Sequence, residues 1–310
     1  MEIYLPIAEL SVNLFTLLAI GAAVGFLSGM FGVGGGFLIT PLLILYNIPP
    51  AIAVGTGANQ VIATSLSGTL VHIKRRTIDF KMGVFLLVGG IVGSTLGAFT
   101  FAFLRKLGQL DLAISVLYVV FLGMIGTLML WESVSVLLAN RRPTDPANPP
   151  IRKSVQHNWI HKLPLKMRFN VSRLYISVIP VLGIGAFIGF LSDVMGVGGG
   201  FIMVPAMIYI LKMPTNVVVG TSLFQIIFVS AYTTLIQATA NNTVDVVLAI
   251  CLMIGGVAGA QYGANAGQKM RGEQLRALLA LLVLAVGLRL AYGLFVTPDN
   301  VYTISAIGAQ

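Results

Sequence analysis

The stretch Gly32-Val33-Gly34-Gly35-Gly36-Phe37 returns almost unchanged 164 positions later, as Gly196-Val197-Gly198-Gly199-Gly200-Phe201. Each copy follows a strongly apolar run, and a proline follows each copy at the same distance, as Pro41 and Pro205. Successive glycines break a helix within an apolar segment and leave backbone N–H groups that need a partner. Two such breaks at matching places in two hydrophobic halves are typical of a transporter's binding site.

The similarity between the two halves extends beyond these glycines. With a separation that drifts from 164 to 166 residues, the matched positions are Ser28 and Ser192, Pro50 and Pro214, Val54-Gly55-Thr56 and Val219-Gly220-Thr221, Gln60 and Gln225, and Thr77-Ile78-Asp79 and Thr243-Val244-Asp245. The drift corresponds to two small insertions, and the whole pattern indicates an internal duplication.

The composition is that of a membrane protein. Of the 310 residues, 57% are hydrophobic and 9% are charged, whereas a soluble domain carries roughly 25% charged residues. Long uncharged runs at a mean hydropathy of +0.93 predict an all-α polytopic membrane protein in the lipid bilayer. The net charge of +9 is explained by basic loops, so no nucleic-acid partner is expected. The single cysteine, Cys251, excludes an intrachain disulfide framework.

Each half reads as five apolar segments. The ranges are 12–30, 37–48, 51–73, 80–104 and 110–131 in the first half, and 174–192, 201–211, 214–238, 243–267 and 273–296 in the second. At about 1.5 Å per residue, the second segment of each half is too short to cross a hydrocarbon core of about 30 Å. We therefore expect each half to contain a glycine-broken or re-entrant helix pair followed by three transmembrane helices.

Basic residues predict the topology and the division of the chain. The segment 139–173 contains one acid and eight basic residues, which are Arg141, Arg142, Arg152, Lys153, Lys162, Lys166, Arg168 and Arg173. Basic loops stay in the cytoplasm. The expected units are a first transmembrane repeat (1–138), a basic cytoplasmic linker (139–173), a second transmembrane repeat (174–296) and an extracytoplasmic tail (297–310).

The same charge rule predicts that the two halves are inverted. Counting segments from the linker places the loop 74–79 in the cytoplasm and the loop 239–245 outside, and the outer loop carries no Lys or Arg. The two loops are equivalent in the repeat, so we expect inverted repeats. Arg105 and Lys106 would face outward, against the rule.

The glycine segments fit an anion site better than a nucleotide site. No Gly-Lys-Ser/Thr follows them, so neither is a P-loop. Helices that begin near Phe37 and Phe201 would direct the positive ends of their dipoles towards one place. The candidate substrate-binding glycines are Gly34, Gly35, Gly36, Gly198, Gly199 and Gly200. The alternative is that they are helix kinks that serve packing.

The third segment of each half adds uncharged hydrogen-bonding side chains to the candidate site. These are Thr56, Asn59 and Gln60 in the first half, and Thr221, Ser222 and Gln225 in the second. The threonine and the glutamine of each set are four residues apart, so they share a helix face. Uncharged donors suit an oxyanion that has to be released again. Hydrogen bonding between helices is the alternative.

Rows of glycines four residues apart are expected to serve packing instead. They comprise Gly21, Gly25 and Gly29, then Gly89, Gly93 and Gly97, and finally Gly255, Gly259, Gly263 and Gly267. Small residues at this spacing allow transmembrane helices to approach closely.

At the level of these motifs the chain resembles the TauE/SafE family of sulfite and organosulfonate exporters. The likeness runs through Gly32–Pro41 with Val54–Gln60 and again through Gly196–Pro205 with Val219–Gln225, and it covers nearly the whole chain. The resemblance implies transport of a small sulfur-containing anion, commonly as export, across a bacterial inner membrane. The glycine motif is specific to the family and not to one substrate.

Two ionisable residues lie within apolar segments. Asp193 precedes the second glycine break, where the first half has Gly29. It is a candidate for carrying a coupling proton, for capping the broken helix or for lying at the interface. Arg289 is a candidate for contacting substrate or pairing with Asp193, or its long side chain reaches the membrane surface. A proton and a sodium ion are both candidate coupling ions.

The leading functional hypothesis is a secondary transporter that holds the anion at the two glycine breaks and works by alternating access. The alternatives are an anion-selective channel and a transporter of another small organic anion. An enzyme is not expected, because the sequence has no HExxH motif and no paired intramembrane aspartates. No cofactor or metal site is predicted, and no oligomeric state is assigned.

Overall fold

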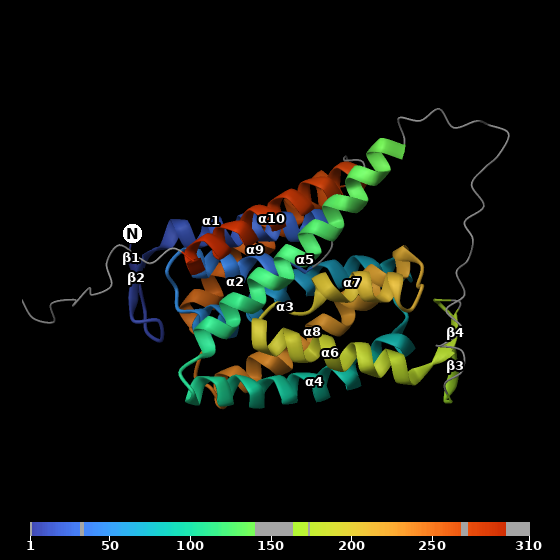
Figure 1. The fold of residues 1–310 in the computed structure, drawn as a ribbon, viewed down its shortest axis with the longest axis horizontal. Helices are drawn as coiled ribbons and strands as arrows, with labels where there is room; N and C mark the ends of the chain where they lie inside the picture. Colours follow the sequence, from blue (N-terminus) through green and yellow to red (C-terminus); the bar gives the residue numbers. More distant parts are fainter. Residues whose placement is uncertain (1, 32–33, 140–163, 173, 268–271, 296–310) are drawn as a thin grey trace, which may run out of the picture.

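The computed structural model describes residues 2–31, 34–139, 164–172, 174–267 and 272–295, and within them the fold is mostly helical (Figure 1). The first half contains β1 (Glu2–Leu5), β2 (Leu10–Asn13), α1 (Leu14–Phe31), α2 (Gly36–Leu45), α3 (Pro50–Lys74), α4 (Phe80–Lys106) and α5 (Leu110–Ala139). The second contains β3 (Lys166–Phe169), β4 (Leu174–Ser177), α6 (Val178–Met195), α7 (Gly200–Tyr209), α8 (Thr215–Thr239), α9 (Val246–Gly267) and α10 (Gly272–Phe295).

Each of the ten expected apolar segments contains one helix. The short second segments are α2 and α7, with 10 residues each, which corresponds to about 15 Å of helix. Stretches long and apolar enough to cross a membrane lie in α4, α5, α6, α8 and α9. The large apolar side chains that these helices expose, such as Val88, Val92 and Phe99 on α4, suit contact with lipid.

One antiparallel hairpin precedes the first helix of each half. The sequence patterns do not predict these hairpins. In the first hairpin Glu2 pairs with Asn13, and in the second Lys166 pairs with Ser177. The strands have only four residues each, too few for a clear alternation of apolar and polar positions. The sequence predicts that the segment 139–173 is linker, but its described end contains the strand β3. The apolar segment expected from 174 begins as a strand, and its helix α6 starts only at Val178.

The first helix of each half packs along the fourth helix of the other half. The pairs are α1 with α9 and α6 with α4, and glycines line both contacts. A Cβ atom built on Gly25 would lie 2.1 Å from the carbonyl oxygen of Gly256, and one on Gly93 would lie 1.8 Å from that of Ala186. No side chain fits at such distances, so the expectation that the glycine rows serve helix packing is confirmed.

The two hairpins lie at opposite ends of the helix bundle (Figure 1). Each contacts a loop of the opposite half through an aspartate. The Asp245 carboxylate accepts a hydrogen bond from Ile7 N–H in the first hairpin, at 3.0 Å. The Asp79 carboxylate accepts one from Ser172 N–H in the second, at 3.1 Å. These bonds tie the loop 239–245 to one end of the bundle and the loop 74–79 to the other.

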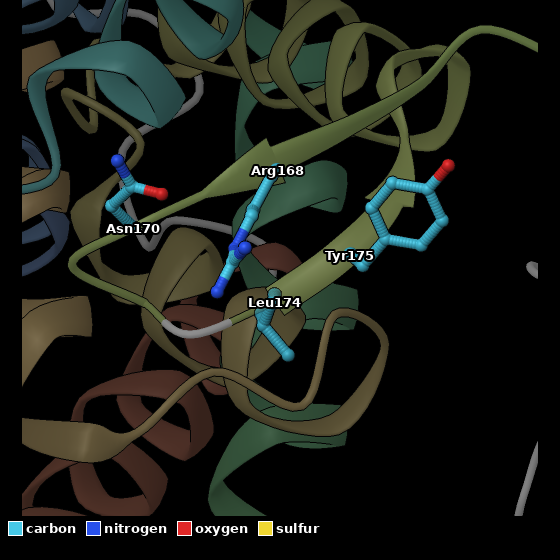
Figure 2. A pocket seen from close by; sticks show the side chains of 4 residues that line it. All are labelled: Arg168, Asn170, Leu174 and Tyr175. Carbon is cyan, nitrogen blue, oxygen red and sulfur yellow. The ribbon is translucent and has the colours of Figure 1, made fainter.

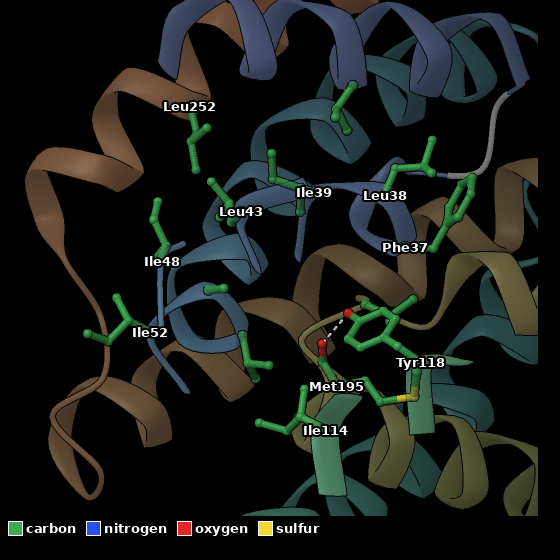
Figure 3. Packing of buried hydrophobic residues seen from close by; sticks show 14 of the residues in the cluster. Phe37, Leu38, Ile39, Leu43, Ile48, Ile52, Ile114, Tyr118, Met195 and Leu252 are labelled. Carbon is green, nitrogen blue, oxygen red and sulfur yellow. Dashed lines mark hydrogen bonds between the residues drawn. The ribbon is translucent and has the colours of Figure 1, made fainter. Parts of the chain in front are cut away.

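The short helices lie inside the hydrophobic core. The first cluster of buried side chains surrounds α2 and includes Phe37, Leu38 and Leu43 together with Tyr118 of α5 (Figure 3). The second surrounds α7 and includes Met203 and Met207. The glycine breaks that precede these helices are therefore held at the centre of the protein by apolar packing.

Candidate functional site

The chain turns back on itself at both glycine breaks. A Cβ atom built on Gly35 would lie 2.6 Å from the Cβ of Ser28, and one on Gly199 would lie 2.5 Å from Cγ2 of Ile188. Ser28 and Ile188 belong to α1 and α6, the helices that have just ended. Gly35 and Gly199 therefore pack against the helix that precedes each break.

Left-handed backbone explains why glycine occupies these turns. The φ angles are 82° at Gly34 and 68° at Gly35 in the first break, and 70° at Gly198 and 75° at Gly199 in the second. A side chain disfavours this conformation, and glycine does not. The predicted interruption of the helix at each glycine segment is confirmed.

The two breaks meet each other at the start of the short helices. The rings of Phe37 and Phe201 stack with their centroids 4.2 Å apart. A Cβ atom built on Gly36 would lie 2.1 Å from the carbonyl oxygen of Val197. The amino-terminal ends of α2 and α7 thus lie together, and with them the positive ends of both helix dipoles. The Gly36 N–H is already used within its turn, because it donates to the Gly34 carbonyl at 2.9 Å.

Two serine hydroxyls that the sequence analysis missed lie against the breaks. Ser65 Oγ is 3.2 Å from the position of a Cβ on Gly34, and Ser230 Oγ is 3.1 Å from that of a Cβ on Gly198. Both serines have no exposed surface, and neither hydroxyl has a hydrogen-bond partner among the described residues. Such groups are rare in folded proteins and require an explanation. The sequence signal was their recurrence at equivalent positions of α3 and α8.

The threonines of the predicted site have structural partners instead. Thr56 Oγ1 accepts a hydrogen bond from Asp245 N–H at 3.0 Å, and Thr221 Oγ1 accepts one from Asp79 N–H at 3.1 Å. Each bond joins one half of the chain to the other. Both aspartates also cap the helix that follows: the Asp79 side chain accepts from Met82 N–H and that of Asp245 from Leu248 N–H, each at 3.1 Å. This placement favours the alternative that the threonines link helices.

The remaining predicted side chains divide into two groups. Asn59 and Ser222 donate to carbonyls of their own helices, Asn59 to Thr56 O at 3.5 Å. Gln60 donates to Gly21 O of α1 at 3.0 Å, and within the described part of the chain its side-chain oxygen has no partner. Neither amide atom of Gln225 has a partner among the described residues. The structure therefore brings glycines of the two breaks together, whereas the polar side chains do not converge on one point and most of them have separate partners.

The two ionisable residues of the predicted site are not brought together. Asp193 has no exposed surface and lies between α4 and α8, where Ser94 Oγ and Gln237 Nε2 each lie 3.4 Å from its carboxylate. Arg289 is exposed, and its guanidinium lies 5.9 Å from the ring centroid of Tyr292 on the same helix. The alternative that the Arg289 side chain reaches the membrane surface stays a prediction.

Tyr118 of α5 is a further residue at the second break that the sequence analysis did not select. Its hydroxyl donates to the carbonyl of Met195, the last residue of α6 (Figure 3). The final carbonyls of a helix have no partner within the helix and need one from elsewhere. Tyr118 thus helps to hold the end of α6 at the point where the chain turns.

Two pockets of the structure lie away from the breaks. One of about 770 Å³ is formed by the second hairpin and is lined by Arg168, Asn170, Leu174 and Tyr175 (Figure 2). Another of about 480 Å³ lies on α9 beside Met253 and Val257. The glycine breaks themselves are packed against one another, with Gly36 against the Val197 carbonyl and Phe37 against Phe201. Among the described residues, no three His, Cys, Asp or Glu side chains gather as metal ligands would.

Comparisons with known proteins agree with this architecture. The family model described as "Sulfite exporter TauE/SafE" matches residues 17–290. The "Probable membrane transporter protein YunE" of Bacillus subtilis is 29% identical over 90% of this chain and 98% of its own length. A "Probable membrane transporter protein" of Xylella fastidiosa is 31% identical over 89% of this chain and 94% of its own.

An archaeal relative extends the comparison. The "Probable membrane transporter protein MJ0441" of Methanocaldococcus jannaschii is 24% identical over 88% of this chain and 93% of its own length. No solved structure matches the chain. The family and the names of the relatives indicate a multi-pass membrane transporter and not an enzyme. The chain belongs to the TauE/SafE sulfite exporter family.

Proposed function

We propose that this protein is a secondary transporter that exports a small sulfur-containing anion, such as sulfite or an organosulfonate, across a bacterial inner membrane. The anion binds between the amino-terminal ends of α2 and α7. The observation that carries this proposal is the pair of buried hydroxyls of Ser65 and Ser230 beside the two glycine turns, for which the described residues provide no hydrogen-bond partner. An oxyanion accepts hydrogen bonds from both, which removes the cost of leaving them unpaired.

The electrostatics of this place favour an anion. Two helix amino-termini each contribute roughly half a positive charge, which makes the start of a helix a favourable place for an anion. The side chains against the turns, among them Ser65, Ser230 and Val61, are uncharged. A site without a fixed cation binds an anion weakly enough to release it on the other side. The substrate class itself is taken from the family description.

The way the halves are joined supports alternating access. The stacked Phe37 and Phe201 hold the two breaks together, so opening the site to either side requires one half to move against the other. The hairpins at opposite ends of the bundle and the backbone that turns back at each break support inverted repeats with re-entrant helices (Figure 1). The closed packing favours a carrier over the anion-selective channel.

The test is anion binding by the purified protein, measured as a shift in thermal stability. The panel contains sulfite, sulfate, thiosulfate, sulfoacetate, taurine and simple carboxylates. We expect one sulfur anion to stabilise the wild-type protein, and the Ser65→Ala/Ser230→Ala double variant to lose that shift. The control is Ser115→Ala, because the Ser115 hydroxyl donates to Asp111 O within α5. An anion shift that persists in the double variant would place the site elsewhere.

Transport in proteoliposomes separates the carrier from the channel. A carrier loaded with unlabelled anion accelerates the entry of labelled anion, because each return step carries a molecule back. We expect this counterflow with the anion that stabilises the protein. Anion flux that does not saturate and shows no counterflow would overturn alternating access and favour the channel.

A further inference from the structure

A buried polar cluster around Asp193 exists in only one half of the molecule. It consists of Asp193 on α6, Ser94 on α4, and Thr233 and Gln237 on α8, and none of these side chains has exposed surface. At the equivalent positions the other half has Gly29, Ala260, Gly68 and His72. The glycine breaks are duplicated and this cluster is not. A role carried out once in each transport cycle, and not by both halves, fits such an arrangement.

The orientation of Gln237 is set by its other partners. Its side-chain oxygen accepts hydrogen bonds from Asn241 Nδ2 at 2.9 Å and from Thr243 Oγ1 at 3.0 Å. The amide nitrogen therefore faces Asp193, 3.4 Å from both the carboxylate and the backbone carbonyl of that residue. On the other side, Ser94 Oγ lies 3.4 Å from the carboxylate and 2.8 Å from Thr233 Oγ1.

These partners of the carboxylate are all neutral. An ionised carboxylate is costly to bury unless a positive charge or strong hydrogen bonds compensate it, and bonds of 3.4 Å are long. Titratable groups on the surrounding elements are engaged elsewhere: Tyr118 with Met195 O, Tyr232 with Thr95, Arg105 with Asn241 O, and His72 with Thr77. The charge of Asp193 is therefore best removed by a cation that comes and goes.

A proton fits this cluster better than a sodium ion. A sodium ion needs several oxygen atoms directed at one point, whereas Gln237 presents its amide nitrogen, a donor, to the carboxylate. The Ser94 and Thr233 hydroxyls bond each other and leave one hydroxyl directed at Asp193. Donors of this kind accommodate both the neutral and the ionised carboxyl group, as a group that gains and loses a proton requires.

We propose that Asp193 binds the proton that is coupled to anion transport. This inference rests on the proposed function, because the anion site begins at the glycine turn just after α6 ends at Met195. A negative carboxylate repels an anion nearby, and a neutral carboxyl group does not. Anion and proton therefore bind together and move in the same direction. The sum of the two gradients then sets the direction of net transport.

A chain of hydrogen-bonded polar groups leads from Asp193 towards the end of the bundle. Gln237 connects the carboxylate to Asn241, and the Asn241 carbonyl accepts a hydrogen bond from Arg105. Arg105 is exposed at the end of α4. The chain of polar groups marks the direction in which the proton leaves the cluster.

The first test needs no transported anion. Infrared difference spectra of the purified protein, recorded between acid and alkaline pH, show the C=O band of a buried protonated carboxyl group. We expect this band in the wild-type protein and in Asp111→Asn, which changes an exposed acid at the start of α5. We expect its loss in Asp193→Asn. A band that is unchanged in Asp193→Asn would overturn the proposal.

The second test measures coupling in proteoliposomes that contain a pH-sensitive dye, with thiosulfate and sulfoacetate as probe anions. We expect the wild-type protein to acidify the interior as the anion enters. We expect Asp193→Asn to retain counterflow of labelled anion and to lose the acidification. Acidification by Asp193→Asn at the wild-type rate would contradict the assignment. An absence of counterflow in the wild type would count against the proposed function, while the infrared result would still decide on Asp193.

Discussion

The aromatic rings of Phe37 and Phe201 stack at the centre of the protein, with their centroids 4.2 Å apart and their planes inclined by 12°. The two residues hold the same position in the two halves, directly after the last glycine of each break. Each is the second residue of its short helix. The contact therefore joins the two parts of the chain that the proposed transport cycle has to separate.

Replacing either ring by leucine is expected to weaken the same interaction. Phe37→Leu and Phe201→Leu should each lower the thermal stability in detergent, and the stacking itself contributes about 0.5–1.5 kcal/mol. The double variant should lose less than the sum of the two, because the second change has no stacking left to remove. Phe99→Leu is the control, since that ring is 71% exposed on α4. Strict additivity of the two changes would mean that the rings do not stabilise each other.

The threonine bonds between the halves lead to a prediction about stability and not about transport. Thr56→Val and Thr221→Val leave the N–H groups of Asp245 and Asp79 without an acceptor. Each change should destabilise the protein by about 1–3 kcal/mol, measured as thermal unfolding, while the anion affinity of the folded protein stays the same. Thr56→Ser keeps the oxygen and should retain most of the stability. Loss of anion binding in a stable Thr56→Val protein would return this residue to the substrate site.

The two glutamines are equivalent in sequence and differ in their contacts. Gln60 donates to Gly21 O at 3.0 Å, whereas neither amide atom of Gln225 has a partner among the described residues. Gln60→Leu should therefore lower thermal stability by about 1 kcal/mol. Gln225→Leu should leave stability unchanged or raise it, because a buried amide without partners is costly.

The transport rate of Gln225→Leu shows whether Gln225 serves helix packing or anion transport. If Gln225 meets the anion when the site opens, Gln225→Leu should reduce the rate at least tenfold at a normal protein level. The matched control is Gln261→Leu, a position beside the apolar pocket on the outside of α9. Wild-type transport by Gln225→Leu would show that this amide serves only the packing of α8.

The ends of the bundle provide a test of the inverted topology. Arg75 and Asn242 are exposed in equivalent loops, which the hairpin contacts tie to opposite ends of the protein. In a Cys251→Ala background, Arg75→Cys and Asn242→Cys should react with a membrane-impermeant thiol reagent from opposite sides of the membrane. The background protein alone should not be labelled. Reaction of both positions from the same side would contradict inverted repeats.

Part of the site could be predicted because its signal is local. The glycine run 34–36 and its copy identify themselves by composition and spacing, and the φ angles at Gly34 and Gly198 explain why no other residue serves there. Ser65 and Ser230 recur at equivalent positions, but a serine within a helix reads as an ordinary small residue, so the recurrence alone does not select them. Only the contacts around it show that its hydroxyl is buried without a partner.

The sequence by itself determined the membrane class, the ten helical segments, the duplication and the position of both helix breaks. These features depend on hydrophobicity, glycine content and repetition over short stretches of chain. Tertiary structure decided which helices of the two halves contact each other, where the hairpins lie and which polar groups have hydrogen-bond partners. Thr56 meets Asp245 across 189 residues, and Ser94 meets Thr233 across 139. Partners so distant in sequence are chosen by close packing of whole helices, and no local pattern of residues encodes that choice.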